Sequence, residues 1–326
     1  MKRRNMIITA AVAALSVSIA VIVGLSVSNM SASGKKPEAG SKEETDSSSV
    51  APAETEASSE EETEAPSETE EELNFHMENT LRELTADQFA ALSSLSNEIK
   101  RYYTKPDLND KGRPIEASYF EAIFKQKLGT DVRIMNTDDK RVTLSFALAI
   151  EYDENTDYVL NYLSAKDVKA VFFVSYSYAF NHPEIIRRIL LEGHTLGSMG
   201  YSLPESGFAR LSLEEQYNDL KKMHDYVYET YGYSMDKFFY RDLSYSLASM
   251  GLLWDAGYQT CFYTVSYNDT KHEDVIDAAG FLDAMSSASH KGAIYVLHTT
   301  NTASLIITPS LIDRLREQDY EVGVYN

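Results

Sequence analysis

Hydrophobic and polar residues divide this chain of 326 residues into three stretches of different character. Residues 6–27 are uncharged and mostly apolar, residues 34–72 contain no aromatic and almost no large aliphatic residue, and regular apolar patterns begin near Leu73. About 20 consecutive apolar residues can cross a bilayer as a helix. A stretch without apolar residues cannot bury enough surface to offset the entropy lost on ordering. The pattern therefore predicts a transmembrane signal-anchor within residues 1–33, a disordered acidic linker over residues 34–72 and a folded remainder.

Residues 73–140 favour a small, mainly helical extension. Thr85 and Gln88 have the spacing of a capping box, and apolar residues follow them at helical intervals. A second helix is expected over residues 117–128. The extension is expected either to form a small helical cap or to pack directly on the domain that follows.

From residue 141 onward, short apolar runs alternate with helical patterns. Runs typical of buried strands lie at residues 142–150, 170–175, 194–197, 238–241, 260–265, 293–298 and 321–325. Helices are expected between them at residues 155–166, 183–192, 212–231 and 309–318, and in a segment ending at residue 256. Ser212 and Glu215 form a second capping box, and Gly232 is placed to end that helix. This alternation predicts a parallel sheet with helices outside, as a barrel or an open sheet, over residues 141–326.

Charge bears on location and on the class of partner. Lys2, Arg3 and Arg4 precede the apolar stretch, which favours a cytoplasmic N-terminus and a C-terminal domain outside the membrane. The apolar stretch is longer than the core of a usual signal peptide, which favours an uncleaved anchor, although residues 31–33 also permit cleavage. A net charge of −20, with 50 acidic against 30 basic residues, excludes the nucleic-acid-binding class.

The chain has a single cysteine, Cys261, which excludes a disulfide within the chain and a Cys-x-x-Cys site. Its apolar neighbours predict a small buried core residue. An extracytoplasmic protein almost without cysteine is typical of the surface of a Gram-positive bacterium.

Six short pieces of sequence, in order and at plausible spacings, resemble the NodB-homology polysaccharide deacetylases, and in particular the branch that acts on bacterial peptidoglycan. These pieces are residues 169–175, 182–188, 192–197, 211–215, 257–258 and 292–298. The resemblance covers residues 141–326 and implies a distorted, incomplete (β/α) barrel. It also implies hydrolysis of an N-acetyl group by a metal-bound water, with chemistry at the carboxyl ends of the strands.

The family's base and metal ligands are replaced by apolar residues in this sequence. The resemblance places the base at Ala147, the ligand aspartate at Leu148, and the two ligand histidines at Met199 and Leu203. A catalytic zinc needs about three nitrogen or oxygen ligands, whereas a thioether suits copper(I) and leucine has no lone pair. We therefore expect no metal site and no cofactor.

Acidic residues near the expected site do not replace these ligands. Glu151, Asp153 and Glu154 follow the first strand, but without nitrogen partners they make a poor zinc site. We expect them to be solvated loop carboxylates.

Three other positions keep the residue types of the family. Arg241 matches the arginine that orients the base, Asp269 lies near the acid that tunes the catalytic histidine, and His298 matches that histidine, the general acid. Such a relay has no activated water to serve here. A structural role and a functional role both remain open for these residues.

Tyrosines gather at or just after the predicted strand ends. The chain has 22 tyrosines, and aromatic faces pack well against sugar rings, so a glycan-binding role and a simple compositional bias are both open. The candidates for glycan contact are Tyr152, Tyr176, Tyr178, Tyr201, Tyr240, Tyr245 and Tyr267.

The leading interpretation is an extracytoplasmic, membrane-attached deacetylase-like protein that is catalytically degenerate and binds cell-wall glycan or a surface protein. One alternative is an active peptidoglycan N-deacetylase with a rearranged site. A second alternative is a structural or regulatory surface protein without glycan contact. Similarity of fold does not decide among them.

Overall fold

A computed structural model describes residues 75–324, except residues 104, 106, 111, 130–138, 153 and 273. The expected transmembrane segment and acidic linker lie outside these described residues. Within the described residues, no helix is both long and apolar enough to cross a membrane. The described part of the chain groups into one compact unit.

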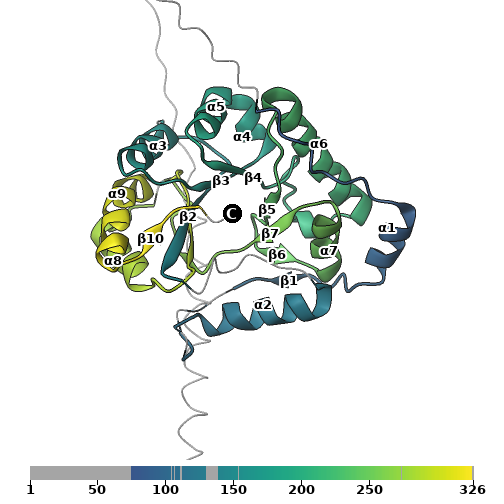
Figure 1. Cartoon of the computed structure of the whole chain (residues 1–326), viewed down its shortest axis with the longest axis horizontal. Helices are drawn as coiled ribbons and strands as arrows, with labels where there is room; N and C mark the ends of the chain where they lie inside the picture. The colour runs from purple at the N-terminus through teal and green to yellow at the C-terminus, as the bar shows by residue number, and fades with distance from the viewer. Residues whose placement is uncertain are drawn as a thin grey trace, which may run out of the picture. The chain divides into compact units, whose positions relative to one another are not determined.

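A curled parallel sheet forms the centre of this unit (Figure 1). Its main path runs in the order β7-β5-β4-β3-β2-β9-β8, with every pairing parallel. The strands are β2 (Arg141–Leu148), β3 (Val171–Val174), β4 (Thr195–Ser198), β5 (Lys237–Phe239), β7 (Gln259–Cys261), β8 (Val265–Ser266) and β9 (Ile294–Leu297). Among the described strands, β7 and β8 are the two edges and do not pair with each other, so the barrel stays open between them.

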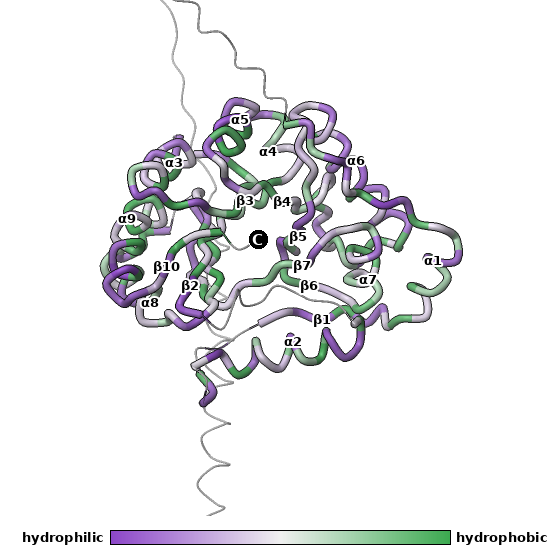
Figure 2. The backbone as a smooth tube through the Cα atoms, in the orientation of Figure 1, coloured by the Kyte–Doolittle hydropathy of each residue, from purple (hydrophilic) through white to green (hydrophobic). Residues whose placement is uncertain are grey.

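Helices cover the outside of the sheet (Figure 1). They are α3 (Asn155–Ala165), α4 (Tyr176–Asn181), α5 (Pro183–Leu191), α6 (Leu213–Tyr231), α7 (Leu247–Asp255), α8 (Ala278–Ser287) and α9 (Thr302–Glu317), with a 3-10 turn η1 (Phe208–Arg210) before α6. Figure 2 shows hydrophobic stretches along β3 and β4, where sheet and helices meet. The predicted α/β class and the incomplete (β/α) barrel are confirmed.

Local sequence signals set several element ends as predicted. The capping box of α6 is present, with the Ser212 side chain accepting from the Glu215 backbone and Glu215 binding back to Ser212. Gly232 ends the helix at φ 66°, a conformation that costs glycine little. The capping box at Thr85 and Gln88 likewise begins α1 (Ala86–Ser93).

Two predicted elements differ from the structure. The strand expected at residues 260–265 is split, because β7 pairs with β5 whereas β8 pairs with β9 on the far edge of the sheet. The helix expected to begin at Pro309 begins at Thr302 instead, since the Asn301 side chain caps it by accepting from the Ala303 N–H at 2.9 Å. Proline lacks an N–H but is tolerated inside this longer helix.

The N-terminal extension packs directly on the barrel, partly on its open side and partly, through its first helix, on α6 and α7 (Figure 1). It contains α1, β1 (Lys100–Arg101) and α2 (Ile115–Leu128), and β1 pairs antiparallel with β6 (Ser244–Tyr245). Tyr102 stacks on Phe262 at 4.4 Å between ring centroids, and its hydroxyl donates to the Tyr263 carbonyl at 2.7 Å. The extension is therefore held by the segment that joins β7 to β8.

The last strand, β10 (Glu321–Val322), pairs with the beginning of β2. The Gly323 N–H donates to the Val142 carbonyl at 3.0 Å, and the Thr143 hydroxyl donates to the Gly323 carbonyl at 2.9 Å. Val324 then packs against apolar side chains inside the barrel. The C-terminal segment, with β10 and Val324, thus covers the inner face of the sheet near the amino ends of the strands.

Candidate functional site

The inner face of the barrel carries an apolar cluster where the resemblance places a metal site. We call it the inner cluster; its buried members are Ala147, Val171, Phe173, Met199, Phe239, Cys261 and Val296. Leu203 packs against it from the loop after β4. The structure therefore brings together three of the four degenerate positions, Ala147, Met199 and Leu203. Cys261 is buried and unbridged, as expected for a core residue.

Leu148 is the fourth position, and it does not join the inner cluster. It is fully buried among the side chains between sheet and helices. Successive side chains of a strand point to opposite faces, so Leu148 faces outward when Ala147 faces inward. The base position and the ligand position of the first strand therefore lie on different faces of β2.

The loop that carries Met199 and Leu203 is held by a buried carboxylate on α6. Asp219 accepts from the Tyr201 N–H at 2.7 Å and the Ser202 N–H at 2.8 Å, and it also accepts from the Ser202 hydroxyl. A Cβ on Gly200, which has a φ of +99°, would lie 2.7 Å from an Asp219 oxygen, so only glycine fits there. Sequence reasoning missed Asp219; the signal was an acid on the buried side of an amphipathic helix.

The retained acid and histidine form a direct pair after β8 and β9. Oδ1 of Asp269 lies 2.8 Å from Nδ1 of His298. Oδ2 accepts from the His298 backbone N–H at 2.8 Å and from the Ser304 hydroxyl at 2.6 Å. Asp269 is fully buried, whereas His298 is partly exposed. The carboxylate accepts from Nδ1–H, so Nε2 is the nitrogen left to accept a proton.

Arg241 lies beyond the end of β5 and is exposed. Its guanidinium makes no hydrogen bond or ion pair with any residue that the structure describes. The carboxylate that such an arginine orients in the family is replaced by the methyl group of Ala147, which offers it no partner.

The acid expected to be solvated after the first strand, Glu151, is instead bound on several sides. It accepts from the Thr156 N–H at 2.8 Å, from the Thr156 hydroxyl and from the Tyr178 hydroxyl. Burial, and then the Glu151 carboxylate, raises the pKa of Tyr178, so its hydroxyl stays protonated and donates. The expectation for Glu151 was wrong because this carboxylate joins β2 to the start of α3 and to α4. Glu154 is exposed, and Asp153 lies outside the described residues.

Three of the seven tyrosines proposed for glycan contact are buried. Tyr178, Tyr240 and Tyr245 are core residues, and the Tyr240 hydroxyl lies 2.7 Å from that of Ser249. Their aromatic faces are covered by neighbouring side chains, so they cannot pack on a sugar ring in this structure.

The other four tyrosines stack against aromatic neighbours near strand ends. Tyr176 stacks on Tyr201 at 4.1 Å, and Lys222 lies 5.7 Å from the Tyr201 ring centroid. Tyr152 stacks on His272 at 4.2 Å, and Tyr267 on Phe281 at 4.2 Å. Three stacked pairs thus flank the rim of the barrel, one after β3 and β4, one after β2 and one after β8.

The residues at the expected metal position do not fit a divalent metal ion. In the described ranges, no three His, Cys, Asp or Glu side chains come close enough together to hold one. A thioether and an isobutyl group stand at the positions of the two ligand histidines, the base position is a methyl group, and Leu148, at the position of the ligand aspartate, faces away from them.

Comparison with known proteins agrees with this fold. Residues 135–261 match the family model described as polysaccharide deacetylase. The (β/α) part of this chain is thus similar to the polysaccharide deacetylase family. The chain is 28% identical over 190 residues to the peptidoglycan-N-acetylmuramic acid deacetylase PdaA of Bacillus subtilis, covering 57% of this chain and 70% of that protein. It is 23% identical over 209 residues to the peptidoglycan-N-acetylglucosamine deacetylase PgdA of Listeria monocytogenes, covering 63% of this chain but 43% of that protein.

Solved structures show the same fold. The structure of Bacillus subtilis PdaA, a family 4 carbohydrate esterase, matches with a TM-score of 0.63 at 24% identity, over 70% of this chain and 96% of that chain. BA3943 of Bacillus anthracis, described as a CE4 family pseudoenzyme, matches with a TM-score of 0.53 at 22% identity, over 59% of this chain and 66% of that chain. A mutant of BA3943 is described as having restored enzymatic activity.

Proposed function

We propose that this protein is an extracytoplasmic, catalytically degenerate member of the polysaccharide deacetylase family that binds cell-wall glycan without deacetylating it. One observation carries the proposal: Ala147, Met199 and Leu203 converge in an apolar cluster where the family holds its base and two metal-binding imidazoles. An alanine methyl cannot accept a proton from water, and these side chains cannot hold a metal that would lower the pKa of water.

The base and the metal ligands are lost, but the residues at the position of the general acid remain. The Asp269–His298 pair can still hold a proton at a defined nitrogen, and general acid catalysis needs such a group. A general acid acts only once a nucleophile has attacked, and the inner cluster supplies neither a base nor a metal for one. A family relative described as a pseudoenzyme gives precedent for this kind of loss.

Glycan binding is supported by the stacked tyrosines on the rim. Tyr176 with Tyr201, and Tyr152 with His272, hold planar rings in fixed positions near the carboxyl ends of the strands. Aromatic faces of this kind pack against the apolar faces of sugars. The relatives that match are named as enzymes acting on peptidoglycan, which makes cell-wall glycan the favoured ligand class. A surface protein as the partner, without glycan contact, is the outcome left if peptidoglycan does not bind.

The location outside the cytoplasm rests on the sequence and on the relatives. The apolar stretch at residues 6–27 follows three basic residues, and the relatives come from Gram-positive bacteria with a peptidoglycan wall. We propose a membrane-attached protein whose acidic linker carries the domain into the wall.

The retained Asp269–His298 pair supports a second candidate, an active deacetylase with a rearranged site. One experiment separates the two. The full-length protein is purified, its metal content is measured, and acetate release from peptidoglycan is followed alongside a pull-down with insoluble peptidoglycan. We expect peptidoglycan binding, no stoichiometric zinc and no acetate above the buffer control. Stoichiometric zinc together with acetate release would establish the active enzyme, and absence of binding would favour a surface protein without glycan contact.

A further inference from the structure

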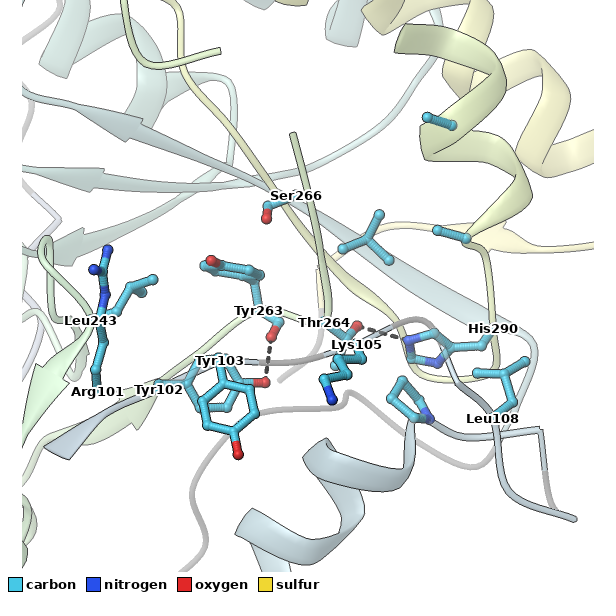
Figure 3. A pocket seen from close by; sticks show the side chains of 14 residues that line it. Arg101, Tyr102, Tyr103, Lys105, Leu108, Leu243, Tyr263, Thr264, Ser266 and His290 are labelled. Carbon is cyan, nitrogen blue, oxygen red and sulfur yellow. Dashed lines mark hydrogen bonds between the residues drawn. The ribbon is translucent and has the colours of Figure 1, made fainter. Parts of the chain in front are cut away.

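A pocket of about 610 Å³ lies at the open side of the barrel, between the N-terminal extension and the segment around β8 (Figure 3). Arg101, Tyr103 and Lys105 form part of one wall, and Tyr263, Ser266 and His290 form part of the other. The pocket belongs to neither the rim tyrosines nor the retained acid–histidine pair. It exists because β7 and β8 do not pair and the extension packs across the gap.

The pocket is positively charged in an acidic protein. Among the described residues that line it are two cations, Arg101 and Lys105, and no carboxylate, although the chain carries a net charge of −20. The Arg101 backbone pairs with Ser244, but its exposed guanidinium makes no hydrogen bond or ion pair with the residues described. Lys105 lies 3.9 Å from the largely buried carboxylate of Glu116, so the two charges partly compensate each other. Burial lowers the pKa of His290, which therefore adds no charge near neutral pH.

Aromatic and hydroxyl groups surround these cations. The Tyr103 ring is 57% exposed and packs edge-on against Phe120 at 5.7 Å, so it presents a fixed face to solvent. Tyr263 is held through its carbonyl, which accepts from the Tyr102 hydroxyl at 2.7 Å. In Figure 3, the Tyr263 ring is drawn between Arg101 and Lys105. A pocket with an arginine, a lysine and tyrosine faces fits a ligand that combines an anionic group with a sugar ring.

The pocket also adjoins the interior of the barrel. Leu243 and Tyr263 line it and at the same time pack against the inner cluster. A ligand held there would contact two side chains that also pack against the inner cluster.

We propose that this pocket at the open side of the barrel is a second binding site, specific for a saccharide that carries a carboxylate or phosphate group. The guanidinium of Arg101 and the ammonium of Lys105 bind the anion, and Tyr103 and Tyr263 pack on the ring. Charge-assisted hydrogen bonds to both cations make the anionic group the main determinant of affinity. The proposal goes beyond glycan binding on the rim and holds even if the rim binds nothing.

Calorimetric titration of the full-length protein tests this site with three probes: N-acetylmuramic acid, glucose 6-phosphate and neutral N-acetylglucosamine. We expect at least one anionic sugar to bind about tenfold or more tightly than the neutral one, and its affinity to fall at high salt. Binding of N-acetylmuramic acid alone would indicate a carboxylate ligand. Binding of glucose 6-phosphate alone would indicate a phosphate ligand.

Variants locate the binding. Arg101→Ala and Lys105→Ala are each expected to weaken the anionic sugar by about tenfold, because each removes a charge-assisted hydrogen bond. Lys127→Ala, an exposed cation on α2 outside the pocket, is the matched control and should leave the affinity unchanged. Equal affinity for the neutral sugar, or unchanged binding by Arg101→Ala and Lys105→Ala, would overturn the proposal. Loss of anionic-sugar binding in Tyr201→Ala alone would place that ligand on the rim instead and would overturn it as well.

Discussion

His298 and Asp269 are joined twice: the Asp269 carboxylate binds the His298 ring at Nδ1 and the His298 backbone N–H, both at 2.8 Å. The pair is retained although the inner cluster lacks the base and the metal-binding histidines with which such a pair works in the family. A buried carboxylate with three donors contributes to stability whether or not any chemistry remains. Retention of this pair is therefore explained by stability as well as by catalysis, and does not by itself establish an active enzyme.

Replacing Asp269 tests this structural role. We expect Asp269→Ala to lower the free energy of unfolding by about 2–3 kcal/mol, because it leaves the His298 N–H and the Ser304 hydroxyl buried without their acceptor. His298→Ala should cost about 1 kcal/mol, since the carboxylate keeps two of its three donors. Urea unfolding measures both. A larger loss in His298→Ala than in Asp269→Ala would contradict this account.

The convergence of three degenerate positions predicts that a metal site can be rebuilt. Ala147→Asp, Met199→His and Leu203→His together place one carboxylate and two imidazoles in the inner cluster. We expect this triple variant to bind zinc, which the unmodified protein is expected not to bind, as measured by metal content after dialysis. The matched control is the same triple variant with Ala147→Asn, whose neutral amide is a poor zinc ligand. Absence of zinc from the carboxylate variant would mean that these positions do not face one another as described.

Leu148 should respond differently from Ala147, because the two side chains face opposite sides of β2. We expect Leu148→Asp to destabilise the protein by about 3–5 kcal/mol, since it buries a carboxylate without a partner between sheet and helices. Leu148→Met, which keeps the volume, should cost less than about 1.5 kcal/mol. Thermal or urea unfolding measures the difference. A Leu148→Asp variant as stable as the parent would show that this position opens to solvent.

Removing one ring of the rim pair should weaken binding to insoluble peptidoglycan. Tyr176→Ala and Tyr201→Ala each break a stack at 4.1 Å, and we expect each to reduce the bound fraction by about tenfold if the ring faces a sugar. Tyr158→Ala is the matched control, since this tyrosine is 48% exposed and lies within α3, outside the stacked pairs of the rim. Equal binding by all three variants would remove the rim tyrosines from the glycan site.

Two buried histidines predict a loss of stability in mild acid. Burial lowers the pKa of both His194 and His224 to about 4, whereas an unfolded histidine takes up a proton near pH 6.5. Between these values the unfolded chain binds more protons, so stability is complete above about pH 6.5 and falls as the pH drops towards 4. The loss is at most about 3 kcal/mol for each histidine.

Urea unfolding at a series of pH values measures this slope. In the folded protein Nε2–H of His224 faces Oδ1 of Asn79 at 3.1 Å and Nδ1 faces the Tyr258 hydroxyl at 2.6 Å, so Gln is the conservative replacement. His224→Gln should flatten the dependence on pH relative to the parent. An unchanged slope would mean that His224 does not resist protonation.

Much of the fold could be predicted from local sequence. Alternating apolar runs and helical periodicity specify the order of strands and helices, and capping residues such as Ser212 and Gly232 set helix ends, because these effects act over a few neighbouring residues. The absence of ligand chemistry at Ala147, Met199 and Leu203 could also be read from the sequence, since side-chain type alone decides what can bind a metal.

Which residues surround each side chain could be learned only from the tertiary structure. The sequence indicated tyrosines after strand ends, but only the packing shows that Tyr240 is enclosed in the core while Tyr201 lies on the rim. Glu151 was expected in solvent, whereas the first turns of α3 and α4 bring the hydroxyl groups of Thr156 and Tyr178 to it. These contacts join residues distant in the chain, and no local pattern encodes them.

By itself, the sequence determined the (β/α) class of the domain and the apolar character of its former metal-binding positions, because periodicity and side-chain chemistry are local properties. Only the tertiary structure decided that Leu148 faces away from Ala147, that Asp219 holds the loop after β4, and that the extension leaves a basic pocket between itself and β8. Those outcomes depend on strand register and on how distant segments pack, which are settled by the whole fold at once.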